Sequence, residues 1–90
     1  MPLDFEEACK LVRENPRADI PQGDREMLYV CYKVATVGPR PNCARPGMMQ
    51  MLRRSYWDAW DLYGATMSPA NAKLTYAMIV SENSARLGLS

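Results

Sequence analysis

The sequence predicts an all-α fold, a small antiparallel bundle of four helices. Apolar residues recur at helical spacing in four segments that Pro and Gly separate, and no segment alternates as a half-buried strand does. The connections between the segments are short, which favours antiparallel neighbours. Ninety residues form one domain at the small end of what folds without disulfides or metals, and no internal repeat divides it.

The first helix is expected to begin after Asp4, whose side chain can act as an N-cap, with Glu7 three residues later in a capping-box pattern. Pro16 and the stretch "NPRADIPQGD" end this helix. Its apolar stripe, at positions i, i+3, i+4 and i+7, consists of Phe5, Ala8, Cys9 and Val12.

The second helix is expected to be capped by Asp24 and to run to about Val37, where Gly38 and Pro39 stop it. An advance of about 100° per residue divides this helix into two faces. The core face comprises Met27, Leu28, Val30, Cys31, Val34, Ala35 and Val37. The opposite face is aromatic and cationic, and it carries Arg25, Tyr29, Tyr32, Lys33 and Thr36.

The third helix is expected from near Met49 to Gly64, after the Pro- and Gly-rich loop "VGPRPNCARPGM". It is unusually aromatic for so small a core. Most of its apolar side is expected to lie in the core, and that side carries Met49, Leu52, Tyr56, Ala59, Trp60 and Tyr63.

Ser68 followed by Pro69 predicts the start of the last helix, which is expected to run from Ala70 to about Leu87 and to close at Gly88. This helix is apolar on two sides, so it either lies between neighbours or presents one side to an apolar ligand. One strip consists of Leu74, Ala77 and Met78, and the other consists of Ala72, Tyr76, Ile79 and Val80.

Composition and charge exclude several classes of protein. A hydrophobic fraction of 48% and a charged fraction of 23% are ordinary globular values, so disorder is not expected. A net charge of +1 gives no support to nucleic-acid binding. The absence of histidine removes Ser-His and Cys-His catalytic pairs and histidine metal sites.

Three widely spaced cysteines fit neither a disulfide framework nor a zinc cluster, which predicts a reducing compartment. The N-terminal residues "MPLDFEEACK" lack the apolar run of a signal peptide, and no segment approaches the roughly 18 apolar residues of a membrane span. We therefore expect a cytoplasmic protein without stable membrane insertion.

The aromatic and cationic face of the second helix allows two interpretations. It can be simply solvated, because tyrosine often lies half-buried with its hydroxyl in water. It can instead bind a ligand that offers a ring for stacking and anionic oxygens for the phenols and the Lys33 ammonium. A phosphorylated nucleotide meets both demands, and Arg13, Arg53 and Arg54 lie where they could add positive charge.

Four blocks of the sequence, "YVCYKVATVG", "RPGM", "WDAW" and "MSPANAKLTY", resemble in their order the acyl-coenzyme-A-binding protein family. The resemblance runs from about Phe5 to the last helix, nearly the whole chain. It implies an up-down-down-up four-helix bundle in which residues 1–90 form a single acyl-CoA-binding domain. It also implies that this domain binds long-chain fatty acyl-CoA and catalyses nothing.

The resemblance assigns ligand binding to particular residues. Arg13 stands where the family tends to have a basic residue, and Cys9 stands where a small residue near the ligand is usual. The ligand-binding tyrosines and lysine of the family match Tyr29, Tyr32, Lys33 and Tyr76.

The chain also departs from the family pattern. Tyr56 stands where the family usually has a lysine that meets the ligand's phosphate, and Arg54 or Arg53 could supply that charge instead. Glu26 occupies a position where leucine is common, facing the groove for the acyl chain. The expected acyl-CoA site therefore comprises Cys9, Arg13, Tyr29, Tyr32, Lys33, Arg54, Tyr56 and Tyr76.

The leading hypothesis is a monomeric carrier that holds a pool of acyl-CoA and delivers it to enzymes, with no cofactor, metal or nucleic acid involved. The alternative is a helical adaptor that binds a partner helix in the same groove. Methionines suit such adaptable contacts, and the candidates are Met48, Met49, Met51 and Met67. An enzyme is the weakest hypothesis, because without histidine no pairing of nucleophile and base is evident.

Overall fold

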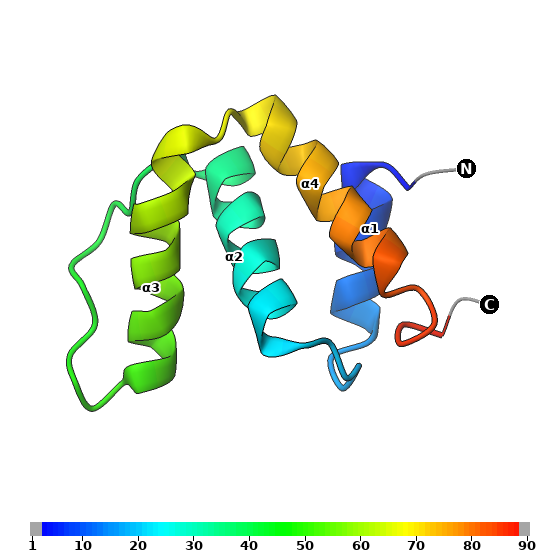
Figure 1. The fold of residues 1–90 in the computed structure, drawn as a ribbon, viewed down its shortest axis with the longest axis horizontal. Helices are drawn as coiled ribbons and strands as arrows, with labels where there is room; N and C mark the ends of the chain where they lie inside the picture. Colours follow the sequence, from blue (N-terminus) through cyan, green and yellow to red (C-terminus); the bar gives the residue numbers. More distant parts are fainter. Residues whose placement is uncertain (1–2, 89–90) are drawn as a thin grey trace.

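The computed structural model describes residues 3–88, and four α-helices make up most of that range (Figure 1). The helices are α1 (Phe5–Glu14), α2 (Gln22–Thr36), α3 (Met51–Tyr63) and α4 (Pro69–Glu82). A 3-10 turn, η1, covers Gly64–Thr66 directly after α3. No strand occurs among the described residues, and the predicted all-α class with four helices is confirmed.

The helix α2 packs against both α3 and α4, and α1 packs against α4. Chain direction follows the up-down-down-up order, in which α2 and α3 run parallel to each other (Figure 1). The loop of residues 37–50 makes this order possible, because it carries the chain back beside α3 before that helix begins. The short connections predict that helices adjacent in sequence run antiparallel. The pair α2 and α3 departs from this expectation because the long loop between them lets them run parallel.

Two of the predicted helix caps are confirmed. Asp4 precedes α1, and its Oδ1 accepts a hydrogen bond from the backbone N–H of Glu7 at 2.8 Å. Ser68 precedes α4, and its hydroxyl oxygen accepts from the N–H of Asn71 at 3.1 Å, with Pro69 at the first helical position. Each acceptor satisfies a backbone donor that has no partner inside its helix.

The predicted cap of α2 at Asp24 is wrong. The helix begins earlier, at Gln22, and Pro21 occupies the cap position without a side-chain hydrogen bond. Asp24 lies in the first turn, where its Oδ2 accepts a hydrogen bond from the Asn83 side-chain amide at 3.1 Å. The Asp24 carboxylate therefore makes a tertiary contact with the end of α4 instead of the expected hydrogen bond to the backbone at the start of α2.

The predicted C-terminus of α4 at about Leu87 is also wrong, because the helix ends at Glu82. Asn83 is buried beneath this end, and its Nδ2 donates to the carbonyl oxygen of Ile79 at 2.9 Å. Residues 83–88 continue as hydrogen-bonded turns that bury Leu87 and reach Gly88, whose φ is +82°. The turns, rather than an extended helix, bring the apolar Leu87 side chain into the core.

The core is centred on Trp60, the largest of the fully buried side chains. Its indole Nε1 donates to the Gly38 carbonyl oxygen at 3.0 Å, which holds the start of the long loop against α3. A Cβ on Gly64 would lie 2.5 Å from the carbonyl oxygen of Pro39, so only glycine fits there. Around Trp60 the deepest side chains are Val30, Cys31, Val34 and Val80.

Several predicted apolar faces are only partly covered. The helix α3 begins at Met51, two residues later than expected, and its apolar side is buried only near the C-terminus, at Ala59 and Trp60. The exposed members of the predicted apolar faces are Val37, Met49, Leu52, Tyr63, Leu74 and Met78.

Candidate functional site

A pocket of about 430 Å³ opens beside α1 and α2 and receives residues from all four helices. The helix α1 contributes residues from its second half, α2 contributes its aromatic and cationic face, and α3 and α4 contribute one tyrosine each. The connection of residues 15–20 contributes the remaining lining residues. The lining residues are Cys9, Val12, Arg13, Asn15, Pro16, Ala18, Ile20, Arg25, Leu28, Tyr29, Tyr32, Tyr56 and Tyr76.

Two groups of aromatic rings flank this pocket. On the α3 side, the Tyr29 ring lies 5.1 Å from Tyr56 and 6.2 Å from Trp60, centroid to centroid. On the α4 side, Phe5 lies 5.2 Å from Tyr76 in an edge-on arrangement and 6.2 Å from Tyr32 in a stacked one. The neighbouring rings pack against one another, and Tyr29, Tyr32, Tyr56 and Tyr76 all line the pocket.

Tyr76 is the most buried of the pocket tyrosines. Burial raises its pKa, and the neighbouring Cys9 adds to that shift. Burial likewise raises the pKa of Cys9 above its usual value, although a hydrogen bond from Tyr76 partly opposes the effect. Both groups therefore stay protonated at neutral pH, which leaves hydroxyl and thiol hydrogens available for donation and no thiolate nucleophile at Cys9.

Arg13 on α1 and Lys33 on α2 are the expected sources of positive charge. Arg13 lies in the last turn of α1 and lines the pocket. Lys33 does not line it, because its Nζ lies 5.7 Å from the ring centroid of Tyr29 and 5.6 Å from that of Trp60. Such contacts with ring faces hold the ammonium at the edge of the α3-side aromatic group.

The two arginines at the start of α3 have different surroundings. Arg54 lies away from the pocket, in a second hollow that it shares with Met48, Met51, Ser55 and Asp58. Arg53 is near enough to the Tyr29 hydroxyl to lower its pKa, against the larger upward effect of burial. Arg53 and Arg54 are the candidates to replace the lysine that the family usually has at the position of Tyr56. Of the two, Arg53 lies nearer to the aromatic residues of the site.

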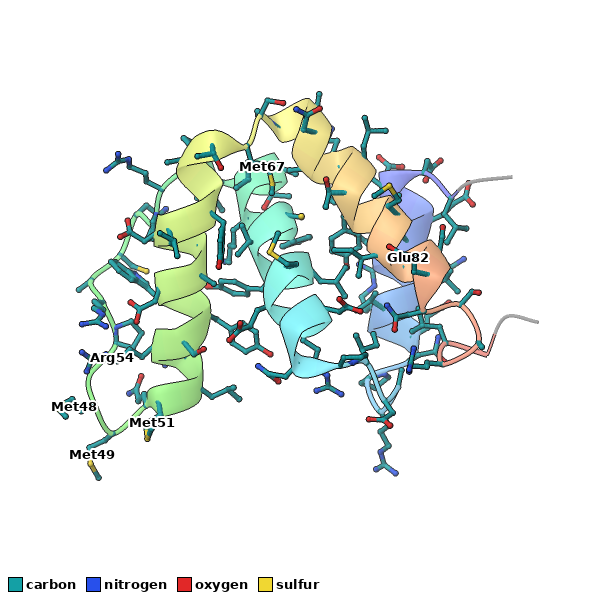
Figure 2. The ribbon with its side chains drawn as sticks, viewed as in Figure 1. Met48, Met49, Met51, Arg54, Met67 and Glu82 are labelled. Atoms are coloured by element: carbon teal, nitrogen blue, oxygen red, sulfur yellow. The ribbon has the colours of Figure 1, made fainter. Side chains whose placement is uncertain are left out.

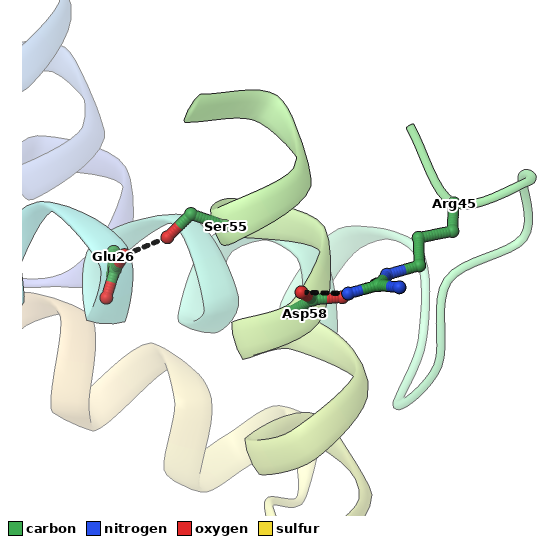
Figure 3. A network of polar contacts seen from close by, with 4 residues as sticks. All are labelled: Glu26, Arg45, Ser55 and Asp58. Carbon is green, nitrogen blue, oxygen red and sulfur yellow. Dashed lines mark hydrogen bonds and ion pairs between the residues drawn. The ribbon is translucent and has the colours of Figure 1, made fainter. Parts of the chain in front are cut away.

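Polar contacts join α2 to α3 beside the pocket. The Ser55 hydroxyl donates to the Glu26 carboxylate at 2.5 Å, and the Gln22 side-chain amide donates to the Tyr56 hydroxyl at 3.4 Å. Figure 3 shows the Glu26–Ser55 contact between the two helices and, on the other side of α3, the pair formed by Arg45 and Asp58. Glu26 thus lies on the α3-facing side of α2 and has a polar partner there.

The sequence missed a group of pocket residues in and around the α1–α2 connection. Arg25 was placed on the polar face of α2 but given no role, and its guanidinium donates to the carbonyl oxygens of Ile20 and Ala18 at 2.9 Å each. Leu28 was expected only in the core and also forms part of the pocket wall. Connection residues have no periodicity, so no sequence signal could have assigned Asn15, Pro16, Ala18 and Ile20 to the pocket.

Six of the eight expected site residues line one pocket: Cys9, Arg13, Tyr29, Tyr32, Tyr56 and Tyr76. Lys33 lies behind Tyr29, and Arg54 lies outside. Residues 3–88 contain no cluster of three or more Cys, Asp or Glu side chains that could hold a metal ion. Among the helices of that same range, none has the length and apolar character that a membrane crossing requires.

Comparison with known families gives a match over most of the chain. The sequence model of the family described as "Acyl CoA binding protein" matches residues 3–80. The crystal structure of acyl-CoA-binding protein 2 from Oryza sativa superposes with a TM-score of 0.76 at 32% sequence identity. That superposition covers 93% of this chain and 90% of the rice chain.

Individual relatives match over shorter or longer stretches. The acyl-CoA-binding protein of Gossypium hirsutum is 46% identical over 57 residues, which are 63% of this chain and 62% of the cotton protein. The match thus spans less than two thirds of the cotton protein's own length. Enoyl-CoA delta isomerase 2 of Homo sapiens is 33% identical over 87 residues, which are 93% of this chain and 21% of the human protein.

Proposed function

This chain belongs to the acyl-CoA-binding protein family, and we propose that it binds long-chain fatty acyl-CoA non-covalently in the pocket beside α1 and α2. In this role it acts as a carrier and pool former for acyl-CoA. No finding favours the alternative in which the same groove holds a partner helix.

The observation that carries the proposal is the chemistry gathered in one pocket. Tyrosine rings offer faces for the adenine, and their protonated hydroxyls offer donors for phosphate oxygens. Arg13 lines the same pocket and adds a fixed positive charge. Val12, Ile20 and Leu28 supply apolar wall, which suits the acyl chain.

The headgroup and the acyl chain are expected to contribute differently to the free energy of binding. A hydrogen bond to a charged group contributes roughly 1.5–3 kcal/mol net, so two or three such bonds hold the headgroup. Burial of the chain contributes about 0.8 kcal/mol per methylene, or on the order of 8 kcal/mol for ten methylenes before the costs of ordering. The chain should therefore determine discrimination by length, and the headgroup should exclude free fatty acid.

We assign the polar roles residue by residue. Tyr29, Tyr32 and Tyr76 hold the headgroup through their rings and hydroxyls, and Lys33 meets a phosphate after leaving the ring faces that it now covers. Cys9, Arg13 and Tyr56 complete the wall of the pocket. Arg54 is the least supported member of the set, because it lines a different hollow.

The wider biology is part of the same proposal. Residues 1–90 act as a single acyl-CoA-binding domain, a monomer in the cytoplasm that passes its cargo to acyl-CoA-using enzymes and performs no catalysis itself. Protonated Cys9 supports the absence of acyl transfer to the protein, because a thiol is a far weaker nucleophile than a thiolate.

Isothermal titration calorimetry with palmitoyl-CoA, palmitate and free CoA tests the proposal. We expect tight binding of palmitoyl-CoA, much weaker binding of CoA and none of palmitate, with affinity rising along a series of acyl lengths until the pocket is full. Equal affinity for all chain lengths, or binding of palmitate as strong as that of palmitoyl-CoA, would contradict the proposal.

A further inference from the structure

Four large apolar side chains gather where the long loop enters α3, and no part of the described chain covers them. Met48, Met49, Met51 and Leu52, which we call the methionine tip, are 78%, 97%, 77% and 60% exposed. Figure 2 shows the three methionines together at this end of the molecule, with Arg54 close to them on α3. None of the four belongs to the hydrophobic core or to the residues packed against it.

The backbone at the methionine tip is ordered by local hydrogen bonds. The N–H of Gln50 donates to the Gly47 carbonyl at 3.0 Å, and the N–H of Arg54 donates to the Gln50 carbonyl at 2.9 Å. The exposed side chains therefore project from a turn and the first turn of a helix. Exposed apolar residues that occur together in this way mark a contact surface more often than scattered ones do.

The charge around the tip has one sign along the sequence. No Asp or Glu occurs from residue 27 to residue 57, whereas Lys33, Arg40, Arg45, Arg53 and Arg54 fall in this stretch. Within residues 3–88 the Arg45–Asp58 pair, at 2.7 Å, is the only ion pair. Arg54 lies near enough to Asp58 to help lower the pKa of that carboxyl, but neither Arg53 nor Arg54 forms an ion pair there.

The acidic groups nearest the tip are already engaged. The Asp58 carboxylate accepts two hydrogen bonds from the Arg45 guanidinium, at 2.8 and 2.7 Å. The Glu26 carboxylate accepts the Ser55 hydroxyl on the side of α3 that faces α2. The tip therefore combines apolar side chains with unpaired cations, the pairing that an anionic lipid surface attracts.

We propose that the methionine tip docks reversibly on an anionic lipid surface, with the methionines and Leu52 at the boundary of headgroups and acyl chains and Arg53 and Arg54 at lipid phosphates. Four side chains are too few for permanent insertion, so the contact is weak and salt-dependent. Tyr56 follows Ser55 on α3 and lines the acyl-CoA pocket, so docking brings one wall of that pocket toward the bilayer.

This inference goes beyond the proposed acyl-CoA binding and is tested without that ligand. The full chain is sedimented with vesicles of phosphatidylcholine containing about one third phosphatidylserine, and with vesicles of phosphatidylcholine alone. We expect binding to the anionic vesicles that falls as salt rises. Replacing all three tip methionines, Met48→Ser, Met49→Ser and Met51→Ser, should weaken binding by about tenfold or more.

A matched control exists on α4, where Leu74 and Met78 are 69% and 61% exposed and the one neighbouring cation, Lys73, has its Nζ over the Phe5 ring at 5.8 Å. The variant L74S/M78S should bind vesicles within about twofold of the parent, because it removes comparable apolar area elsewhere. The variant R53Q/R54Q should lose roughly fivefold per arginine and become less sensitive to salt.

Methionine oxidation gives a second readout that needs no substitution. Brief peroxide treatment followed by peptide mass spectrometry should show slower sulfoxide formation at Met48, Met49 and Met51 when anionic vesicles are present. Met78 serves as the internal control and should oxidise at the same rate with and without vesicles. Circular dichroism and palmitoyl-CoA titration of the methionine variant establish that the fold and the pocket persist.

Several results would overturn the proposal. These are absence of binding to anionic vesicles, equal binding by the parent and the methionine variant, and protection of Met78 to the same degree as the tip. Dimers that sedimentation velocity detects in the parent but not in the methionine variant would assign the tip to a second copy of the chain. Each of these outcomes leaves the acyl-CoA calorimetry unaffected, so the two proposals fail separately.

Discussion

The two ends of α3 carry similar apolar residues on the same predicted side and have opposite environments. Toward the C-terminal end, Ala59 and Trp60 are buried, and Trp60 donates to the start of the long loop, while at the N-terminal end Leu52 is exposed. Helical spacing determines which residues share a face. Whether another element covers that face depends on where its neighbours end, and here the parallel α2 covers only one end.

The largest difference between the two ends should appear in unfolding. Trp60→Ala is expected to lower the free energy of unfolding by about 3–5 kcal/mol, because it leaves a cavity in the core and removes the hydrogen bond to Gly38. Leu52→Ala, on the same helix, should cost less than about 0.5 kcal/mol. Urea unfolding followed by circular dichroism measures both, and similar losses would mean that the tip is covered in solution.

The next largest effect concerns ligand affinity near the buried C-terminal end of α3. There the Lys33 ammonium lies over the Trp60 and Tyr29 rings. Lys33→Ala is expected to weaken palmitoyl-CoA binding by roughly 1.5–3 kcal/mol, the cost of one charge-assisted hydrogen bond, with little change in fold stability. Calorimetry provides the comparison. Lys10→Ala, on the exposed face of α1, is the matched control and should bind as the parent does.

A smaller effect on the free energy of unfolding is expected at alkaline pH, and it should differ between the buried Cys31 and the exposed Cys43. Burial raises the pKa of Cys31 to about 11, whereas Cys43 lies exposed in the long loop. Above about pH 9 most of the unfolded thiol loses its proton while folded Cys31 keeps it, so stability is full below about pH 8 and falls by roughly 1 kcal/mol between about pH 9 and 10.

Urea unfolding of variants between pH 8 and 10 checks this dependence. Cys31→Ala lowers stability throughout by removing core volume, but it should make the decline with pH less steep, and the remaining decline comes from groups such as Cys9 whose pKa is also raised. Cys43→Ala should retain the decline of the parent. An unchanged slope in Cys31→Ala would show that another group causes the alkaline loss.

The smallest effect is expected at the exposed ion pair of α3. A hydrogen bond from Arg45 lowers the pKa of Asp58, so the pair contributes to stability above the usual aspartate pKa and loses that contribution as pH falls through the lowered value. Thermal unfolding should show Asp58→Asn slightly below the parent at pH 7 and equal to it in strong acid. A variant that melts far below the parent at pH 7 would contradict this minor role.

Local signals predicted the parts of the fold that depend on adjacent residues. Asp4 and the Ser68–Pro69 pair were assigned correctly because an N-cap needs only the next three residues. Asp24 has the same chemistry but was assigned wrongly, because its partner Asn83 is distant in sequence. The end of α4 failed for the same reason, since the buried Asn83 stops the helix and the following turns bury Leu87.

The candidate site divides in the same way. The aromatic and cationic face of α2 could be read from helical spacing, and Tyr29 and Tyr32 do line the pocket. The opposite wall could not, because residues 15–20 have no regular spacing and Arg25 takes its position from the carbonyls of Ala18 and Ile20. Arg54 was selected by charge and sequence distance alone, and the turn of α3 directs it to another hollow.

Localising the ligand tests the central claim most directly. In a titration of ¹⁵N-labelled protein with palmitoyl-CoA, followed by two-dimensional NMR, the largest amide shifts should occur around Cys9, Arg13, Tyr29 and Tyr32. Amides of Met49 and Leu52 should hardly move. Shifts confined to the methionine tip, or no shifts at micromolar ligand, would contradict the assignment of acyl-CoA to the pocket beside α1 and α2.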